Sequence, residues 1–154
     1  MALWVDPQLV LAQRVRPGPC GDFSDLAPLA SSAYALVPFQ QLVADAGYDS
    51  EANHRFCREE LRVESLIMAK PRRSQTIVAT TPYRLEMCRL LGEPGDPLAH
   101  QAYRQRWKAE TVMSVTKRKF GEALTARTIP MQDRQALLRG VIDNVHRLAL
   151  LSLT

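Results

Sequence analysis

Residues 41–47, QLVADAG, predict the fold more clearly than any other stretch of the chain. The apolar run before Asp45 has the length and composition of a buried strand. Gly47 permits a tight turn directly after it. The segment therefore predicts a strand whose carboxyl end presents an aspartate.

The residues after this strand predict a helix and then a second strand. Residues 50–61 form the helix, with Asp49 or Ser50 as its N-cap, and residues 63–69 are a further apolar run. A strand, a helix and a strand in this order predict a parallel α/β unit. Asp45 would then lie at the strand ends, where open α/β sheets bind ligands.

The flanking regions extend this α/β prediction. Residues 3–5 and 9–15 indicate two strands or a hairpin, and residues 24–35 indicate a helix with Asp22 or Ser24 as its N-cap. Residues 74–98 contain several prolines and predict a loop region or small insertion, with one helical segment around 83–91. Two helices complete the expected domain, which spans residues 1–154: residues 99–120, where no glycine or proline intervenes, and a closing helix over residues 132–151.

Composition indicates a single globular domain with a basic surface. The chain has 154 residues, 46% of them hydrophobic, and a net charge of +4. Residues 101–127 carry seven basic residues against two acidic ones, which is the footprint of a phosphate-backbone binder or of a solvated helix surface. The basic residues are Arg104, Arg106, Lys108, Lys117, Arg118, Lys119 and Arg127.

The sequence contains no clear pattern for a membrane span, a signal peptide or a cysteine cluster. No apolar run approaches the roughly 18–20 residues that span a bilayer, and the start of the chain has no signal-peptide pattern. Cys20, Cys57 and Cys88 have no CxxC spacing. We therefore expect reduced thiols in a cytoplasmic protein with no membrane association.

The predicted helix over residues 99–120 carries four polar residues on one stripe. At about 100° per residue, Tyr103, Arg106, Glu110 and Lys117 fall within an arc of roughly 60°. One interpretation is a solvent face on which Arg106 and Glu110 form an i, i+4 ion pair. The other is the wall of a polar site, in which Glu110 and Asp45 share divalent cations. Carboxylate oxygens suit Mg²⁺ or Mn²⁺ better than Zn²⁺.

The spacing Tyr103-x2-Arg106-x3-Glu110-x6-Lys117 resembles the Y-(2)-R-(3)-E-(6)-K signature of insertion-sequence DDE transposases of the IS-four/IS-five type. The surrounding text is also similar to that family, as is the block around Asp45. The similar segments are YRQRWKAETV at 103–112, KRKFG at 117–121, ADAGYDS at 44–50 and DNVHRL at 143–148.

This resemblance implies an RNase H-like fold, a mixed sheet with flanking helices. It assigns Asp45 and Glu110 as catalytic carboxylates that bind Mg²⁺ or Mn²⁺. The resemblance also implies that the protein binds double-stranded DNA at transposon ends. It further implies that the intact family member is a homodimer. The residues that contact DNA would be Tyr103, Arg106 and Lys117, with Arg118 and Lys119 as additional phosphate contacts.

One part of the family pattern is missing. The first catalytic aspartate should lie on a strand well upstream of Asp45, yet the two strands expected before Asp22 resemble the second and third strands of the family sheet. Asp6 is the weak candidate for that role, and it fits better as the end of a strand. We therefore expect a C-terminal part of the catalytic domain, a partial RNase H-like fold that lacks the first catalytic strand and the usual N-terminal DNA-binding region.

Two functions follow from these observations. The first is a fragment of a bacterial transposase, related to enzymes that cleave and rejoin DNA with two metal ions and inactive alone. The second is a non-catalytic fragment that binds DNA or dimerises and so modulates a full-length transposase. Replacement of Glu110 by glutamine distinguishes them, because catalysis requires that carboxylate and salt-dependent DNA binding does not.

Overall fold

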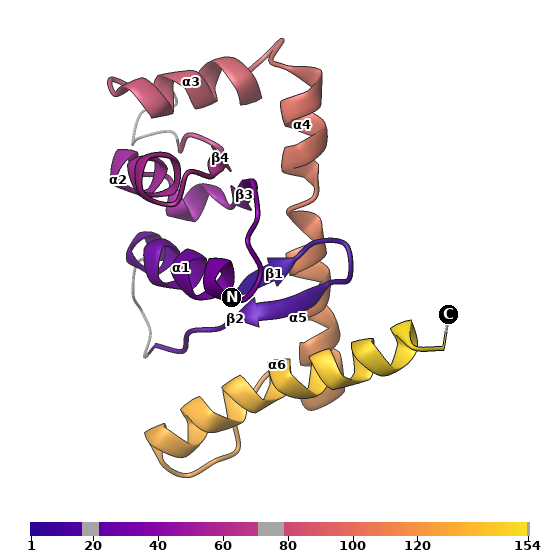
Figure 1. Ribbon diagram of the computed structural model, residues 1–154. Coiled ribbons are helices and arrows are strands. Elements are labelled where there is room, and N and C mark those ends of the chain that lie inside the picture. Colours follow the sequence, from indigo (N-terminus) through magenta and orange to yellow (C-terminus); the bar gives the residue numbers. More distant parts are fainter. Residues whose placement is uncertain (17–21, 71–78, 154) are drawn as a thin grey trace. The chain divides into compact units, whose positions relative to one another are not determined.

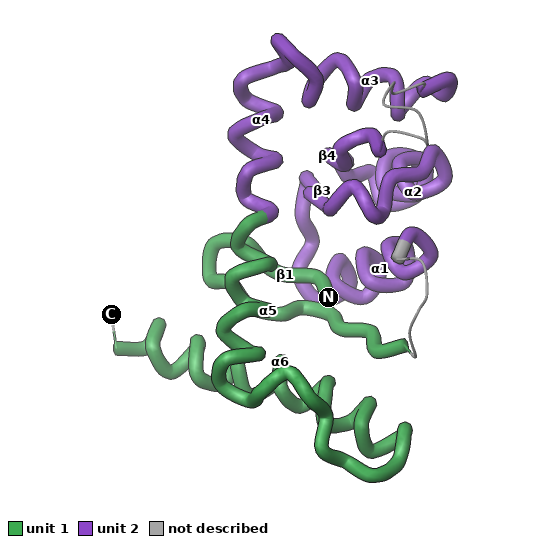
Figure 2. The backbone as a smooth tube through the Cα atoms, turned by 180° about the vertical axis from the view of Figure 1, so that it is seen from behind, with its two compact units in different colours: residues 1–20, 107–154 green, residues 21–106 purple. Residues whose placement is uncertain are grey.

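The computed structural model describes residues 1–16, 22–70 and 79–153, and the chain divides into two compact units. Unit 1 combines residues 1–20 with residues 107–154, and unit 2 comprises residues 21–106 (Figure 2). Cys20 and residues 74–78 of the expected loop region lie outside the described residues. Each unit is described by itself below.

Unit 2 contains the predicted strand–helix–strand motif. Strand β3 (Gln41–Ala44) pairs in parallel with β4 (Glu64–Ile67). Between them lie helix α2 (Glu51–Arg55) and a π-helical turn (Phe56–Glu60). The hydroxyl of Ser50 caps α2 by accepting a hydrogen bond from the Asn53 amide at 3.1 Å. The parallel α/β prediction is therefore confirmed, although α-helical geometry ends at Arg55.

Both faces of this two-stranded sheet are covered. Successive side chains of a strand point to opposite faces. Ile67 packs with Leu26 and Ala30 of helix α1 (Leu26–Leu36). Leu66 packs on the other face with helices α3 (Pro82–Leu91) and α4 (Pro97–Arg104) (Figure 1). Unit 2 thus has helix, sheet and helix layers, with its core on both sides of β4.

Unit 1 is built on a hairpin and two helices. Strands β1 (Ala2–Trp4) and β2 (Leu9–Ala12) pair antiparallel, as expected. Helices α5 (Trp107–Phe120) and α6 (Ile129–Leu151) complete the unit, and α6 contacts β2. The side-chain amide of Asn144 on α6 bonds both the N–H and the C=O of Val10, at 2.7 and 2.8 Å. A side chain therefore joins α6 to β2 in the way that a neighbouring strand would.

Two sequence predictions need correction. The expected mixed sheet is replaced, within the described ranges, by two separate two-stranded sheets. The expected helix over residues 99–120 is two helices, because the Gln105 and Arg106 amides bond the carbonyls of Ala102 and Tyr103, only three residues back. Such tight turns end an α-helix without glycine or proline.

Smaller differences concern helix ends. The closing helix begins at Ile129, three residues before its predicted start. Helix α1 begins after Asp25, which makes no side-chain cap hydrogen bond, so neither predicted cap is confirmed. Across the part of the chain described here, no helix combines the length and apolar character needed to span a membrane.

Candidate metal and nucleic-acid site

Asp45 lies directly after β3, at the position that the sequence predicts. Its Oδ1 accepts a hydrogen bond at 2.7 Å from the Ala46 amide and so caps the short 3-10 turn over residues 46–48. The side chain is 63% exposed, so the carboxylate is accessible to a ligand. The pairing of β3 with β4 and the capped turn therefore fix the backbone position of Asp45.

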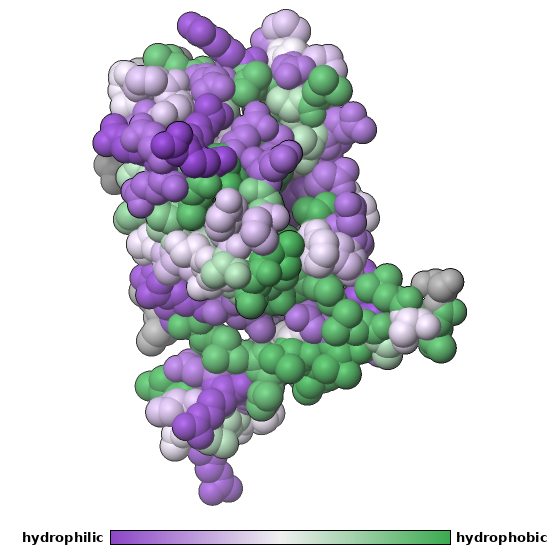
Figure 3. All heavy atoms as spheres, viewed as in Figure 1, coloured by the Kyte–Doolittle hydropathy of each residue, from purple (hydrophilic) through white to green (hydrophobic). Residues whose placement is uncertain are grey.

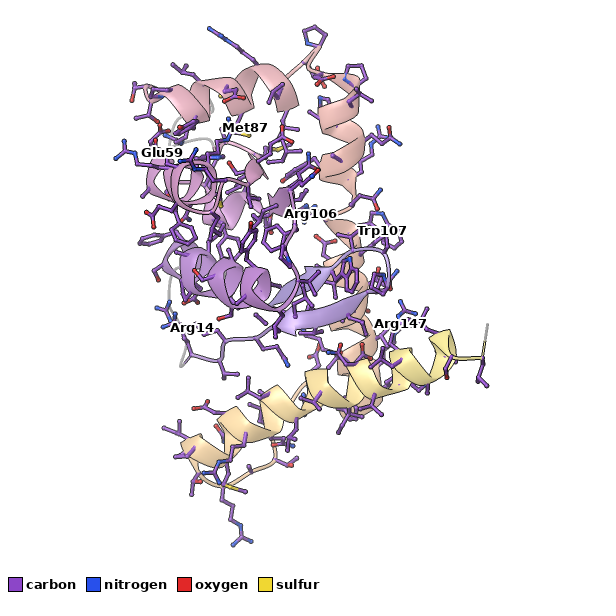
Figure 4. The ribbon with its side chains drawn as sticks, viewed as in Figure 1. Arg14, Glu59, Met87, Arg106, Trp107 and Arg147 are labelled. Atoms are coloured by element: carbon purple, nitrogen blue, oxygen red, sulfur yellow. The ribbon has the colours of Figure 1, made fainter. Side chains whose placement is uncertain are left out.

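The structure brings Asp45 together with two residues of the helical signature. Nη1 of Arg106 lies 3.8 Å from Oδ1 of Asp45, and the guanidinium carbon lies 5.8 Å from the centre of the Tyr103 ring. Tyr103 packs in turn against the core cluster that contains Leu66 and Met87. Figure 4 labels Arg106 and Met87. A core-anchored aromatic ring therefore supports a cation beside the aspartate at the strand end.

A buried ion pair holds the chain just beyond Asp45. Arg84 on α3 contacts Asp49 through Nε and Nη2, both at 2.9 Å, and the two side chains are only 8% and 2% exposed. The second oxygen of Asp49 also accepts the Lys70 amide at 2.7 Å. Sequence analysis missed this pair. The sequence pattern that could have revealed the pair is the position of Arg84, which shares the apolar stripe of α3 with Met87 and Leu91.

Buried polar groups continue behind β4. Oγ of Ser65 accepts a hydrogen bond from Nε of Arg58 at 3.1 Å and lies 2.8 Å from Nδ1 of the fully buried His54. Burial, and then the charge of Arg58, lower the pKa of His54 below its ordinary value. This histidine is neutral at pH 7.

The cysteines do not form a metal site in the described residues. Cys57 and Cys88 are free thiols. Burial raises the pKa of Cys57 to about 11, so it is protonated at neutral pH and is a poor metal ligand.

The remaining signature residues lie in unit 1. Glu110 and Lys117 are both on α5, and their separation of seven residues places them on the same face of the helix. Nζ of Lys117 lies 3.7 Å from the exposed carboxylate of Glu122. Because the helix is interrupted before Trp107, the predicted stripe is divided: Tyr103 and Arg106 belong to unit 2, whereas Glu110 and Lys117 belong to unit 1.

Three further predicted residues have distinct surroundings. Arg118 is exposed. Lys119 instead lies 3.2 Å from the buried carboxylate of Asp143 and 3.3 Å from Nδ1 of His146, so it links α5 to α6. Asp6 is in the hairpin turn that follows β1; its side chain is 91% exposed and lies 3.7 Å from Nζ of Lys108.

The carboxylate oxygens of the candidate site suit a hard divalent cation, but the described residues group too few ligands to hold one. Asp45 and Glu110 offer carboxylate oxygens, which suit Mg²⁺ or Mn²⁺. They belong to different units, and among the residues described no three His, Cys, Asp or Glu side chains are grouped closely enough to hold a metal. The described residues therefore supply the ligand chemistry of a metal site without a complete ligand set.

Comparison with known proteins identifies the family. A family model described as "Transposase DDE domain" matches residues 2–142. This match covers most of the chain, so the chain belongs to the transposase DDE domain family. That family implies an RNase H-like fold, DNA as the partner and, in general, divalent metal ions. Neither the curated proteins nor the solved structures contain a significant match.

Proposed function

We propose that the chain supplies part of the catalytic domain of a bacterial insertion-sequence transposase of the IS-four/IS-five type. It would act in the cytoplasm on double-stranded DNA at transposon ends. The ion pair between Arg106 and the strand-end Asp45, with the Arg106 guanidinium over the Tyr103 ring, is the observation that carries this proposal. Residues of two separate family motifs come together there, although about 60 residues lie between them in the sequence.

In this proposal Asp45 and Glu110 bind Mg²⁺ or Mn²⁺ as the second and third carboxylates of a DDE site. Metal ions held by these carboxylates would supply Lewis-acid chemistry, namely activation of water and stabilisation of the leaving oxygen in phosphodiester cleavage and strand transfer. The exposed turn position of Asp6 does not favour it as the first carboxylate. With two of the three carboxylates assigned, we expect no cleavage by this chain alone.

The other signature residues bind the DNA backbone. Arg106 offers planar, paired N–H donors that match a phosphate, and the Tyr103 ring limits where the guanidinium lies. Lys117 and the exposed Arg118 add positive charge on α5, which positions a duplex without reading its sequence. Lys119 is a weaker candidate, because a contact with DNA would compete with its contact with Asp143.

The proposal is tested by DNA binding in variants that neutralise one carboxylate. Asp45→Asn and Glu110→Gln should each strengthen binding of a short duplex several-fold in EDTA, because a negative charge near the phosphates is removed. Glu60→Gln, at an exposed position on the π-helical turn of unit 2, is the matched control and should have no effect. Fluorescence anisotropy at low salt gives the affinities. Equal effects of all three variants would contradict the proposed site.

A non-catalytic fragment that binds DNA or dimerises, and so modulates a full-length transposase, is the second candidate function. The exposed basic residues Lys117 and Arg118 of α5 favour it, because phosphate contacts require no metal. A nicking assay on transposon-end DNA with Mg²⁺, in which this chain is mixed with an upstream family segment that supplies the first carboxylate, separates the two functions. Nicking that Glu110→Gln abolishes supports the catalytic function, and salt-dependent binding without nicking supports the fragment.

A further inference from the structure

Two acidic residues shortly after Asp45 are bonded to the first turn of helix α3. Asp49 pairs with the side chain of Arg84. The Glu51 carboxylate accepts hydrogen bonds from the backbone amides of Tyr83 and Arg84, at 3.2 and 3.3 Å. The N-cap residue of α3 itself makes no side-chain cap hydrogen bond. A carboxylate 32 residues before Tyr83 therefore caps this helix in its place.

The other end of α3 is joined to helix α4. The Asp96 amide bonds the Leu90 carbonyl at 2.9 Å, across the connection between the two helices. Nε2 of His100, on α4, lies 3.2 Å from the carbonyl oxygen of Gly92, which follows α3. Buried side chains of both helices also belong to one apolar cluster. A displacement of α3 is therefore transmitted to α4.

Helix α4 carries the residues that approach Asp45. Tyr103 lies on α4, and the amide of Arg106 bonds the Tyr103 carbonyl at 3.1 Å. Nη1 of Arg106 lies 3.8 Å from Oδ1 of Asp45. The segment from Asp45 to Glu51, then α3, then α4 thus form a closed loop of contacts within unit 2, and the Asp45–Arg106 pair completes it.

Part of this loop is inaccessible to a ligand such as DNA. Hydrophilic side chains cover the visible face of α2 (Figure 3), but the ion pair that joins α3 to the Asp45 segment is buried. Arg84 and Asp49 are 8% and 2% exposed, and Arg84 donates to both oxygens of Asp49 at 2.9 Å. A phosphate cannot reach this guanidinium, so any effect of Arg84 on DNA binding must act through the position of other residues.

We propose that Glu51 and Arg84 are positioning residues, which hold Arg106 beside Asp45 by fastening the first turn of α3 to the segment after Asp45. The inference rests on the proposed function only for the role of Arg106 in DNA binding. When either bond is broken, α3 and the attached α4 move more freely relative to β3. The Arg106 guanidinium then spends less time beside Asp45, and a phosphate must order it at an additional entropic cost.

Amide hydrogen exchange of the whole folded chain tests the positioning without DNA. Glu51→Gln leaves one carbonyl oxygen to accept two amides, so local opening should become more frequent and the Arg106 amide should exchange severalfold faster. Arg84→Lys keeps the charge but loses the paired donors to Asp49, and it should have the same effect.

Two controls separate positioning from general loosening of unit 2. Glu64→Gln makes the same change of charge at an exposed hydrogen bond with Gln41, where the two strands begin, and should leave the exchange of the Arg106 amide unchanged. The amide of the buried Val63 bonds a carbonyl of the π-helical turn. In Glu51→Gln it should exchange at the wild-type rate.

A double-mutant cycle on DNA binding tests the consequence for the site. Arg106→Gln should cost less affinity in the Glu51→Gln background than in the wild type, with a difference of about twofold or more. The cost of Lys117→Gln, in unit 1, should be the same in both backgrounds. The cycle cancels the direct effect of removing the Glu51 charge.

The outcomes distinguish this inference from the proposed function. Wild-type exchange of the Arg106 amide in Glu51→Gln, or a measurable cost of Arg106→Gln that is equal in both backgrounds, would overturn the positioning role. If exchange rises as expected but Arg106→Gln leaves DNA binding unchanged in the wild type, the proposed DNA site fails and the positioning of Arg106 stands.

Discussion

Unit 2 buries Leu66, Ile67 and Met87 to 1% exposure or less, whereas unit 1 leaves Leu138, Val145 and Leu148 more than half exposed. Most of the buried hydrophobic residues of the described chain belong to unit 2, and unit 1 contributes Val10, Ala12 and Val112. Helix α6 of unit 1 is attached instead by side chains that bond backbone groups, among them Asn144 and Arg139. The two units therefore depend on different interactions, hydrophobic burial in one and directed hydrogen bonds in the other.

The aromatic residues allow the two units to be observed separately. Both tryptophans, Trp4 and Trp107, are in unit 1, and all four tyrosines are in unit 2. Tryptophan fluorescence thus follows the unfolding of unit 1 alone, while far-ultraviolet circular dichroism follows both units. The predictions below use this difference.

The largest effect is expected from the buried ion pair of unit 2. Arg84→Ala leaves the 2% exposed carboxylate of Asp49 unpaired, which should destabilise unit 2 by about 3–5 kcal/mol. In urea, the circular dichroism midpoint should fall further than the tryptophan midpoint. Arg55→Ala, which removes an exposed ion pair with Glu59, is the control and should cost less than about 1 kcal/mol. If Arg84→Ala lowers the tryptophan and circular dichroism midpoints equally, the units do not unfold independently.

A smaller effect is expected from the hydrogen bonds of unit 1. Asn144→Ala removes the partner of both backbone groups of the buried Val10 and should destabilise unit 1 by about 1–3 kcal/mol. The tryptophan fluorescence midpoint in urea measures this loss. Ser152→Ala removes an exposed hydroxyl that bonds Ala149 within α6, and its effect should stay within about 0.5 kcal/mol. An unchanged midpoint for Asn144→Ala would show that unit 1 does not rely on this contact.

Acid should weaken unit 2 through His54. The pKa of His54 is lower in the folded chain than in the unfolded chain, so below the unfolded value near 6.5 the unfolded state binds more protons. Unfolding free energy should fall as pH drops below about 6.5, by at most about 1.4 kcal/mol per pH unit. Urea midpoints at pH 7.5, 6.5 and 5.5 measure this slope. His54→Gln should flatten it, whereas His146→Gln, in unit 1, should not.

The smallest effect concerns DNA binding by the two units. Arg106→Gln in unit 2 and Lys117→Gln in unit 1 should each reduce the dependence of log affinity on log salt by about one. Fluorescence anisotropy at several salt concentrations measures this slope. A change in only one variant would assign DNA binding to one unit. Arg55→Gln, at an exposed position outside the site, provides the control.

Much of unit 2 could be predicted from local patterns. Local patterns mark each element of the strand–helix–strand motif: the apolar runs around Asp45 and Ile67 and the cap at Ser50. Because each pattern lies within its own element, the sequence predicts this motif correctly. The hairpin and the closing helix were recognised for the same reason. Contacts between distant residues leave a weaker pattern, as Arg84 and Asp49 show: a single charged residue on an apolar stripe does not identify its partner.

The helix interruption at Gln105 and Arg106 could not be predicted, because it depends on two backbone hydrogen bonds and no helix-breaking residue marks it. The expected DNA contact at Lys119 has a similar difficulty. The sequence of residues 117–119 suggests one continuous basic surface, yet Lys119 donates a hydrogen bond to Asp143, 24 residues away in the sequence. For the candidate site, the sequence predicts Asp45 at a strand end, as observed. The approach of Arg106 to Asp45 could not be predicted, because it depends on the packing of α4 against the sheet.

The discontinuity of unit 1 in the sequence affects how the chain folds during synthesis. Unit 2 is one continuous stretch, so all of it is synthesised before α5 and α6. The β1–β2 hairpin is synthesised before unit 2 but must wait for Asn144, which lies 134 residues after Val10, and at about 5–20 residues per second this takes roughly 7–27 s. Throughout that interval Val10 lacks the Asn144 amide that bonds its backbone. A nascent chain therefore carries a finished unit 2 and an unsatisfied hairpin, and translation of α6 is the step that completes unit 1.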